Sequence, residues 1–469
     1  MGAEPAALGI DVGQSGARAE MIATSGRVLG SGDVPMRVAA MAGRAEQDVT
    51  AWIAAVYAAS RSAIGASGYR ELAGICAGAL GPAPVLLDGD LRPLAPAILY
   101  RLDNRSEPQR RQLENLTGRP VSADHAVPRL HWWRENHPDL WDRTRTVVDV
   151  TGALVCALSG SAVLDSVSGR EYYDLDGTPA DGDLRLSGRC EPTSVAGTLS
   201  PAAAERLGVA PGAPVLAGSI DSFLDLFAAG VRRPGDGGIV AGSTAVVAQA
   251  ASAEVRPQAR AAGLEVSAYL GPGRLVLDWT GAAGSALDWA AGLLGGRQEL
   301  DRLAAALPPG AGGLVALAGL APRRDGTGLG AISRLSLATG RAEMYRAIVD
   351  AVAIEVAGIG RRCARAAGDP PIWHAWGGAF KSAALTQAVA DCLGSPLAFS
   401  AGSGRVAAAE VARQIVLGGS PVQRWRAVEP DPVRSARMRS LVAESAALAE
   451  CLASWSGDAS GMSVGRAST

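Results

Sequence analysis

The chain has 469 residues, too many for a single hydrophobic core, so its length predicts about two to four domains. Hydrophobic residues make up 48% of the sequence, whereas charged residues make up 19% and the formal net charge is −2, which argues against nucleic acid as a main partner. No stretch approaches the roughly 18 apolar residues of a membrane span, and the first residues do not resemble a signal peptide. We therefore expect a soluble, cytoplasmic protein with no membrane partner.

The six cysteines form no Cys-x-x-Cys pair and lie in or near apolar sequence, which argues against a zinc site and a disulfide framework. Lysine occurs once, at Lys381, so arginine supplies nearly all the positive charge.

The first structured segment is "LGIDVGQSGARAEM", residues 8–21, in which two apolar runs flank a turn from Gly13 to Gly16. The pattern predicts a tight β-hairpin that carries Asp11, Ser15 and Arg18. A turn with several free backbone amides is a concave anion site, which most often holds phosphate. An ordinary hairpin is the alternative, because glycine and serine favour turns in any case.

The same pattern returns in "GGIVAGSTAVVAQA", residues 237–250, about half a chain length later. A turn-rich segment, 230–238, lies between the two copies and is a hinge candidate. One repeat at this distance favours two related domains rather than a solenoid. Two phosphate-type turns, one in each half, would face each other across a cleft that closes on its ligands.

Periodicity and turn residues predict the main elements of both halves. Helices are predicted at 47–66, 341–362 and 382–396, the last with Ser382 as its N-cap. Residues 74–94 predict a buried strand, a Gly-Pro loop, a second strand and a polar turn.

A candidate acid follows a strand in "LAGSIDSFLDLFAAGV", residues 216–231. The pattern predicts a small-residue strand that ends at Gly218 and Ser219, and then an apolar helix that begins near Asp221. Asp221 is suited either to cap that helix or to act as a general base at the end of the strand.

A third motif is "WHAWGGAFKSAALTQAVAD", residues 373–391. Gly377 and Gly378 end a strand and Ser382 opens a helix, so the backbone can approach a flat or charged ligand closely. The Lys381-Ser382 pair does not make a P-loop, because Phe380 stands where that motif needs glycine. No Gly-x-Gly-x-x-Gly follows the first strand, which argues against a dinucleotide-binding domain.

Together these segments resemble the FGGY carbohydrate kinases, an actin-like ATPase family that includes xylulokinases. Eight segments match the motifs of the family in order, from about residue 6 to about residue 420. They are "GIDVGQSGARA", "AEQDVTAWIAAV", "LLDGDLRPLAPAILYRLDNRS", "RLHWWREN", "AGSIDSFLDLFAAG", "AGSTAVV", "GAISRLSLATGRAEMYRAIVD" and "WGGAFKSAALTQAVAD". In the seventh, Arg334 stands where the family usually has glycine.

The resemblance implies an α/β fold of two RNase H-like domains, each a mixed five-stranded sheet flanked by helices, with a cleft between them. The implied boundaries are 1–232 for an N-terminal domain on the sugar and phosphate side, 233–455 for a C-terminal domain on the nucleotide side, and 456–469 for a disordered tail.

The resemblance also implies ATP and Mg²⁺ as cofactors and a role for each matched residue. Asp221 would be the base that takes the proton of the attacking sugar hydroxyl, and Asp11 would hold Mg²⁺ through water. The residues expected to hold the phosphates are Gly13, Gln14, Ser15, Gly16 and Arg18 from the first half and Gly242, Ser243 and Thr244 from the second. Those expected near the adenosine are Gly284, Asp288, Gly377, Gly378 and Ser382, with plain backbone packing as the alternative for the glycines.

On the sugar side the sequence departs from its relatives. Leu80 and Gly81 stand where many pentulose kinases have a Met-His pair, so a sugar-contacting histidine is absent. Asp103 and Arg105 are the sugar-binding candidates, with a solvent-exposed ion pair as the alternative. Two further departures are an altered loop at 319–331 and Trp376 in place of a first glycine in the adenosine motif.

The function implied is ATP-dependent phosphorylation of a small ketose or polyol, pentulose-like, on a terminal hydroxyl. The partners implied are this sugar and ATP, with a homodimer as a further assembly to consider. A second hypothesis is a catalytically inactive regulatory protein that binds sugar or nucleotide with the same fold, which the three departures favour. A third is another actin-like ATPase, such as an amino-sugar kinase.

Overall fold

The computed structural model describes residues 4–36, 39–41, 43–100, 102–118, 121–122, 124–173, 184–270, 273–320, 330–400, 406–419 and 425–458. By its internal contacts the chain divides into two compact units. Unit 1 comprises Met1–Arg232, Ser267–Gly273 and Gly404–Gln423, and unit 2 comprises Arg233–Val266, Arg274–Ser403 and Arg424–Thr469. Within the described ranges, no helix is both long and apolar enough to cross a bilayer.

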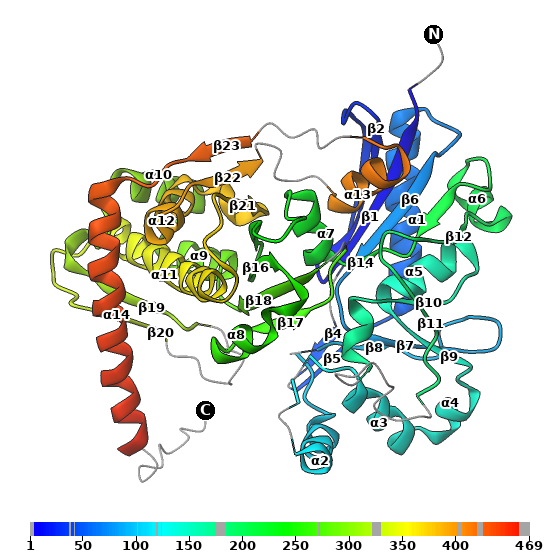
Figure 1. Ribbon diagram of the computed structural model, residues 1–469, viewed down its shortest axis with the longest axis horizontal. Helices are drawn as coiled ribbons and strands as arrows, with labels where there is room; N and C mark the ends of the chain where they lie inside the picture. The colour runs from blue at the N-terminus through cyan, green and yellow to red at the C-terminus, as the bar shows by residue number, and fades with distance from the viewer. Residues whose placement is uncertain are drawn as a thin grey trace. The chain divides into compact units, whose positions relative to one another are not determined.

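Unit 1 is built around a seven-stranded mixed sheet in the order β12-β13-β6-β1-β2-β3, with β14 also paired to β6 (Figure 1). β1 and β2 are antiparallel, with Gly13 opposite Gly16, so the predicted first hairpin is confirmed. β1 is parallel to β6. The strands of the sheet are β1 (Ala6–Gly13), β2 (Gly16–Ala23), β3 (Val28–Pro35), β6 (Gly74–Ala79), β12 (Val195–Thr198), β13 (Pro214–Leu216) and β14 (Ser219–Ile220).

Helices cover both faces of this sheet. Side chains alternate between the two faces of a strand. An added Cβ at Gly9 would contact Ala409 of α13, and one at Gly32 would contact Ala59 of α1. Gly9 and Gly32 lie on opposite faces by the register of the strands, so α1 and α13 do too. The helices of unit 1 are α1 (Val49–Ser67), α2 (Glu107–Thr117), α3 (Val127–Asn136), α4 (Pro138–Arg143), α5 (Val150–Ser159), η1 (Ser168–Glu171), α6 (Pro201–Leu207), α7 (Asp221–Ala228) and α13 (Ala407–Val416).

A second, smaller core lies beside the main sheet in unit 1. It is formed by apolar residues of α2, α3 and α4 that include Trp133 and Trp141. The remaining strands of the unit are β4 (Ala39–Met41), β5 (Arg44–Gln47), β7 (Pro84–Leu87), β8 (Ala97–Ile98), β9 (Thr146–Asp149), β10 (Val163–Asp165) and β11 (Gly188–Cys190).

Unit 2 has its own seven-stranded sheet, in the order β17-β18-β16-β15-β21-β22-β23. The antiparallel β15–β16 pair confirms the second predicted hairpin, and β21 runs parallel to β15. The strands of unit 2 are β15 (Gly237–Ala241), β16 (Ala245–Ala251), β17 (Glu265–Ser267), β18 (Arg274–Thr280), β19 (Val315–Ala318), β20 (Gly330–Ser333), β21 (Trp373–Trp376), β22 (Leu397–Ser400) and β23 (Trp425–Val428).

Both sheets contain the expected five-stranded pattern, but the expected strand number is wrong. In β3-β2-β1-β6-β13 and in β18-β16-β15-β21-β22, two antiparallel pairings precede two parallel ones. Each pattern is extended because a short antiparallel strand, β12 or β23, pairs with the last parallel strand, and β14 or β17 adds a seventh. Such additions satisfy the free backbone groups of an edge strand.

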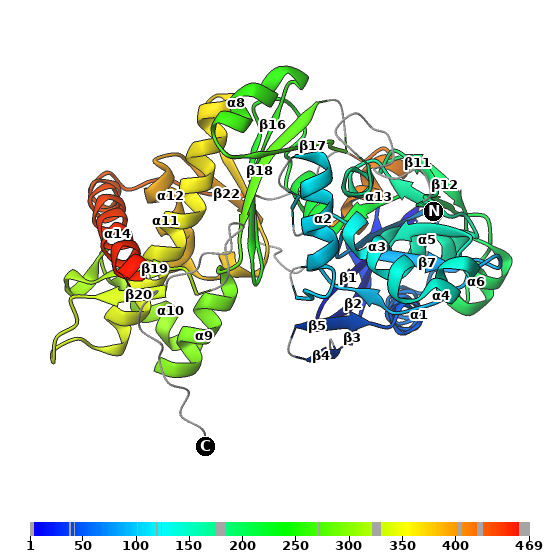
Figure 2. The same ribbon diagram turned by 90° about the horizontal axis from the view of Figure 1, so that it is seen from below.

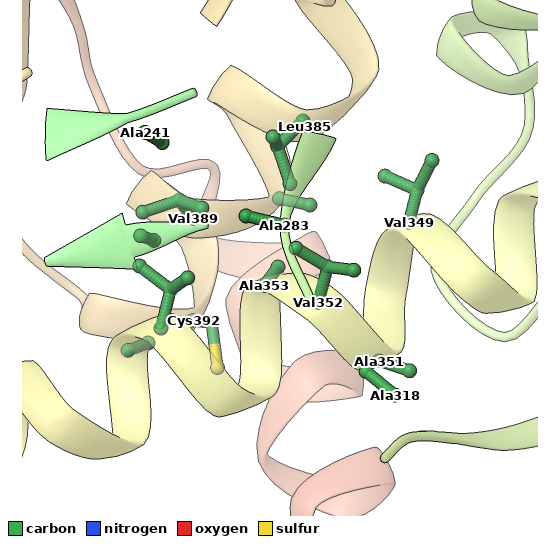
Figure 3. Packing of buried hydrophobic residues seen from close by; sticks show 14 of the residues in the cluster. Ala241, Ala283, Ala318, Val349, Ala351, Val352, Ala353, Leu385, Val389 and Cys392 are labelled. Atoms are coloured by element: carbon green, nitrogen blue, oxygen red, sulfur yellow. The ribbon is translucent and has the colours of Figure 1, made fainter. Parts of the chain in front are cut away.

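The helices of unit 2 pack on its sheet mainly through small side chains. Figure 2 shows α11, α12 and α14 on the same side of β16 and β18. Ala283, Val352, Ala353 and Leu385 meet in this core at close range (Figure 3). The helices are η2 (Ala253–Val255), α8 (Arg256–Ala261), α9 (Gly284–Leu294), α10 (Arg297–Ala306), η3 (Ala311–Gly313), α11 (Arg341–Ala367), η4 (Gly378–Lys381), α12 (Ala383–Leu393) and α14 (Pro432–Asp458).

The predicted helices form where their capping residues indicate. α1 begins after Asp48, which accepts a hydrogen bond from the Thr50 amide. α12 begins after Ser382, whose hydroxyl accepts from the Leu385 amide, and ends before the left-handed Gly394. At the C-terminus α14 continues to Asp458, and residues 459–469 of the expected tail lie outside the described residues.

Candidate active site

An ion pair joins the two strands of the first hairpin in unit 1. Asp11 on β1 lies directly opposite Arg18 on β2, and Arg18 Nη2 donates to Asp11 Oδ2 at 2.5 Å. The Arg18 side chain is half exposed, and the turn residues Gln14 and Ser15 are exposed. Gly16 packs against β3, where an added Cβ would lie 2.5 Å from the Val34 carbonyl oxygen. The hairpin therefore presents polar groups at its turn while its strands remain in the sheet.

Burial raises the pKa of Asp11, and the positive charge of Arg18 opposes that rise. The pKa of Arg18 is raised in turn, chiefly by Asp11 and to a smaller extent by Asp225 and Asp33. This part of unit 1 thus gathers several carboxylates around one guanidinium.

Asp221 is the first residue of α7, which follows the last strand of the main sheet. Ile220 occupies the N-cap position and makes no side-chain capping bond, while Asp221 Oδ1 accepts from the neighbouring Ser222 amide at 2.6 Å. Burial and, to a smaller extent, the charge of Asp11 raise the pKa of Asp221 to about 7. Asp221 is therefore not the N-cap of α7, and its carboxyl titrates near neutral pH.

The predicted strand before Asp221 is in fact two short ones. β13 ends at Leu216 and β14 begins at Ser219, and both pair with β6. Between them Gly218 adopts a left-handed backbone, with φ of 66°, and its Cα lies so close to β6 that a Cβ would be 1.9 Å from the Ala77 carbonyl oxygen. This kink interrupts the strand, and β14 then leads directly into Asp221.

Leu80 and Gly81, the residues that replace the Met-His pair, lie buried in the loop after β6. The Leu80 amide donates to the Val12 carbonyl at the end of β1, which ties the loop to the first hairpin. An added Cβ at Gly81 would lie 2.5 Å from Asp149 Oδ2, so a histidine cannot occupy this position without a shift of Asp149. Contact of these two residues with a sugar is a prediction that the geometry of unit 1 does not test.

Asp103 and Arg105 form a buried ion pair, so the alternative of a solvent-exposed pair is wrong. Their side chains are 0% and 6% exposed, and Arg105 Nη2 donates to Asp103 Oδ2 at 2.7 Å. Asp103 Oδ2 also accepts from the Ala45 amide at 2.8 Å, and Arg105 donates to Glu46 as well. The Arg105 guanidinium lies over the Trp132 ring, 4.9 Å from its centroid. Asp103 is thus placed to orient Arg105, while Glu46 is the more exposed member of the group.

In unit 2 the turn of the second hairpin carries Gly242, Ser243 and Thr244, all exposed. The Gly242 amide donates to the Thr244 carbonyl, which closes the turn at 2.9 Å. The Ser243 carbonyl accepts from the Ser285 amide, so the turn is fixed to the start of α9. The two hydroxyl side chains lie at the surface of the unit.

Two of the expected adenosine glycines have a packing role. An added Cβ at Gly284 would lie 2.3 Å from the Gly242 carbonyl oxygen, and one at Gly377, where φ is 106°, would lie 2.3 Å from the Ala241 carbonyl oxygen. Close approach of backbone to backbone explains both glycines, which is the packing alternative. Gly378 has open space at its Cα and does not need this explanation.

The two polar adenosine candidates have partners within unit 2. The Ser382 hydroxyl is buried and donates to Asp301 Oδ1 at 2.8 Å while it caps α12. Asp288 is exposed and pairs with Arg297. Lys381, the single lysine, is exposed at the end of η4, and the aromatic Trp376 is buried at the end of β21.

Two other departures from the family pattern have local structural correlates. Arg334 adopts φ of 65°, a left-handed conformation that glycine accepts most easily, and it pairs with Glu444 of α14. Of the altered loop at 319–331, residues 321–329 lie outside the described residues.

A buried polar group next to the candidate site could not be recognised from the sequence. Asp149, at the end of β9, accepts hydrogen bonds from the Ala83 amide and the Tyr172 hydroxyl. Asp165 of β10 accepts from the Ser219 hydroxyl in β14. Asp149, Asp165 and Tyr172 belong to no recognisable motif, and only the tertiary fold brings them to the segments that carry Gly81 and Asp221.

The oxygen-rich donor set of unit 1 fits a magnesium ion bound mainly through water. Asp11 and Asp221 influence each other's pKa, and a divalent cation would favour the ionised form of both. Within the described part of the chain, no cluster of three or more histidine, cysteine or acidic side chains could cage a metal directly. Mg²⁺ that is held by one or two carboxylates, substrate phosphates and water needs no such cage.

Comparison with known proteins places this geometry in a family. Residues 6–228 match the model of the N-terminal domain of the FGGY family of carbohydrate kinases, and residues 237–407 match the model of its C-terminal domain. The chain is 31% identical to the xylulose kinase of Streptomyces rubiginosus over 281 residues, which are 51% of this chain and 57% of that protein. The chain thus aligns with little more than half the length of that curated relative.

Solved structures extend the likeness over nearly the whole chain. The xylulose kinase of Rhodospirillum rubrum superimposes with a TM-score of 0.83 at 25% identity, covering 96% of this chain and 99% of that one. The gluconate kinase of Lactobacillus acidophilus shares the fold, with a TM-score of 0.81 at 18% identity and coverage of 96% and 98%. The two sheet-containing units therefore have the actin-like ATPase fold, and the chain belongs to the FGGY family of carbohydrate kinases, which are phosphotransferases.

Proposed function

We propose that this chain transfers a phosphoryl group from ATP to a hydroxyl of a small, pentulose-like sugar, with Asp221 as the general base. The single observation that carries the proposal is the position of Asp221, partly buried at the start of α7 with a pKa raised to about 7 beside the Asp11–Arg18 pair. A sugar hydroxyl is too weak an acid to ionise at neutral pH, so a group with this pKa is suited to accept its proton.

The other residues of unit 1 have roles in charge stabilisation. Arg18 donates to the β- and γ-phosphates in place of its present partner Asp11, and a fixed guanidinium suits the charge that spreads over the transferred group. Asp11, once Arg18 no longer pairs with it, would hold Mg²⁺ through the water molecules of its shell. Magnesium, when bound, supplies neutralisation of phosphate charge.

In unit 2 the proposed nucleotide contacts come from the exposed turn and the open glycine. Gly242, Ser243 and Thr244 offer amides and hydroxyls to phosphate oxygens. Gly378 leaves room for the flat adenosine, whereas Ser382 holds the start of α12 in place through Asp301. Asp288 and its partner Arg297 are the charged pair on this side.

The proposal of a pentulose-like substrate rests on the similarity to proteins described as xylulose kinases, because xylulose is a pentulose. The altered Leu80–Gly81 loop and the Arg105 cluster are the features by which this chain would select its own acceptor. The competing function, a regulatory protein without turnover, is disfavoured because Asp11, Arg18 and Asp221 are all present in one unit.

The test is ADP release in a coupled assay with Mg²⁺-ATP and a panel of ketoses, polyols and aldonic acids. The proposal expects turnover with at least one ketose or polyol and a loss on the order of 10²- to 10⁴-fold with Asp221→Asn under the same conditions. Sugar binding without turnover in the wild-type chain would support the regulatory function instead.

A further inference from the structure

A buried carboxylate, Asp149, contacts the loop formed by residues 80–83 in unit 1. The residue is 1% exposed. Its Oδ1 accepts from the Ala83 amide at 2.6 Å and from the Tyr172 hydroxyl at 2.9 Å. Its Oδ2 is buried and has no hydrogen-bond partner among the described residues. A buried carboxylate oxygen without a partner is costly and requires an explanation in function or in packing.

The packing around Asp149 Oδ2 explains why this oxygen has no hydrogen-bond partner among the described residues. An added Cβ at Gly81 would lie 2.5 Å from Asp149 Oδ2 and 3.3 Å from Ile220 Cγ1. Gly81 is not among the glycines with positive φ, so its backbone would accept an alanine. Glycine is therefore needed at this position for space, because Asp149 and Ile220 both lie where a Cβ would be.

Ile220, which lies next to Gly81, directly precedes the candidate base Asp221 in the chain. Ile220 ends β14 and is followed by Asp221, the first residue of α7. The preceding residue, Ser219, is fixed from the same region, because its hydroxyl donates to Asp165 Oδ1 at 2.8 Å and its carbonyl accepts from the Thr151 hydroxyl at 3.1 Å. Asp149, Gly81 and Ile220 thus form a continuous packed row that ends at Asp221.

We propose that Asp149 is a positioning residue for Asp221, acting through Gly81 and Ile220, and that it fixes the sugar loop and the base in one relative geometry. The inference rests on the proposed function, in which Asp221 is the base. The loop needs no side chain at position 81 in this arrangement, so it would contact a sugar through its backbone and through Leu80.

The charges around Asp149 make this positioning sensitive to pH. Burial and, to a smaller extent, the charge of Asp165 raise the pKa of Asp149 to about 7, against the opposing effect of the Ala83 amide and the Tyr172 hydroxyl. Arg129 of α3 also interacts with Asp149, and it donates to the Pro82 carbonyl in the same loop at 2.9 Å. Protonation of Asp149 weakens its charge-assisted bond to Ala83, so the loop should be held less firmly as the pH falls through about 7.

A double-mutant cycle tests the contact independently of activity. Gly81→Ala should lower the melting temperature of the wild-type chain by several degrees, because the new Cβ meets Asp149. In the Asp149→Ala background the same substitution should lower it by little or nothing, because the carboxylate is gone. An equal loss in both backgrounds would overturn the proposed row.

Steady-state kinetics test the positioning role. Gly81→Ala and Asp149→Asn should each lower kcat/KM for the sugar on the order of 10- to 100-fold, with KM for ATP unchanged, because small displacements of a reacting group are costly. Asp149→Asn should also remove one ionisation near pH 7 from the kcat/KM profile.

The matched control is Asp350→Asn in unit 2. Asp350 is 3% exposed, accepts from the Gly310 amide and pairs with Arg346, so its loss should lower stability without changing the sugar kinetics or the pH profile. If Gly81→Ala lowers stability as this control does and leaves sugar kcat/KM unchanged, the positioning role is refuted. A wild-type chain that phosphorylates no sugar refutes the proposed function and the positioning role together. Failure of the positioning role alone is recognised because the wild-type chain then phosphorylates sugar and Gly81→Ala leaves its kcat/KM unchanged.

Discussion

The two glycine hairpins have the same backbone plan and very different chemistry. In unit 1 the β1–β2 pair carries Asp11 and Arg18 on adjacent strands, close enough to form an ion pair. In unit 2 the β15–β16 hairpin contains no charged residue from 237 to 251, and its turn offers only hydroxyls and amides. The repeated hairpin therefore supplies a glycine-containing turn twice but charge only once.

This difference explains why the acid–base candidates all belong to unit 1. A base needs a shifted pKa, which burial and neighbouring charge provide at Asp221. A turn that only holds phosphates needs donors at its surface, which Ser243 and Thr244 provide without any charge. A duplicated scaffold can in this way assign chemistry to one copy and binding to the other.

The strongest test of this division is Asp221→Asn in unit 1. Turnover should fall on the order of 10²- to 10⁴-fold because the amide cannot accept the hydroxyl proton, and ADP release in the coupled assay measures the loss. Near-normal turnover would remove the acid–base role from unit 1.

Thermal unfolding is the control for this variant. The pKa of Asp221 is raised from 3.8 to about 7 by folding, so its stability contribution is fully present below pH 3.8 and is lost as the pH rises through about 7. Asp221→Asn should therefore melt no lower than the wild-type chain at pH 8.

The second prediction concerns pH. Because Asp221 must be ionised and Asp149 titrates in the same range, kcat/KM should fall by at least tenfold per pH unit below about 7 and level off above it, as measured in a series of buffers at constant ionic strength. A profile that is flat down to pH 5 would mean that Asp221 is already ionised there and that its burial does not tune it.

A smaller effect is expected from Arg18→Ala. Loss of a charged hydrogen bond to phosphate should raise KM for ATP about 10- to 100-fold, while the melting temperature should change little because the side chain is half exposed. Should the variant melt at a much lower temperature and keep normal ATP kinetics, Arg18 would be a structural partner of Asp11 alone.

The smallest effect is expected in unit 2. Ser243→Ala and Thr244→Ala each remove one neutral, exposed hydroxyl, so KM for ATP should rise only about two- to tenfold and stability should be unchanged. A loss as large as that of Arg18→Ala would contradict the division of roles between the hairpins.

Local sequence was sufficient for much of the fold. The turn from Gly13 to Gly16, the helix capped by Ser382 and the strand–loop–strand at 74–94 all depend on residues that are close in the chain. The additional strands β12 and β23 could not be foreseen in the same way, because edge pairing depends on what else reaches the sheet.

The residues of the candidate site could likewise be predicted where they depend on local sequence and not where they depend on distant parts of the chain. Asp11, Arg18 and Asp221 stand within motifs, whereas Asp149 lies in an apolar segment and gains its importance only because folding places it against Gly81. The alternative of a solvent-exposed Asp103–Arg105 pair is wrong for the same reason, since β5 and α3 bury the pair with parts of the chain distant in sequence. Long-range burial is what a single sequence does not reveal.

The exposed position of Lys381 has a practical consequence. It is the sole ε-amine among the side chains and is the last residue of η4, a single turn that begins at Gly378, where the backbone has open space beside it. An amine-reactive fluorophore would therefore attach to one known side-chain location next to the nucleotide-facing loop proposed here. Changes in its emission during titration with ATP analogues would then report nucleotide binding directly, without any engineered cysteine.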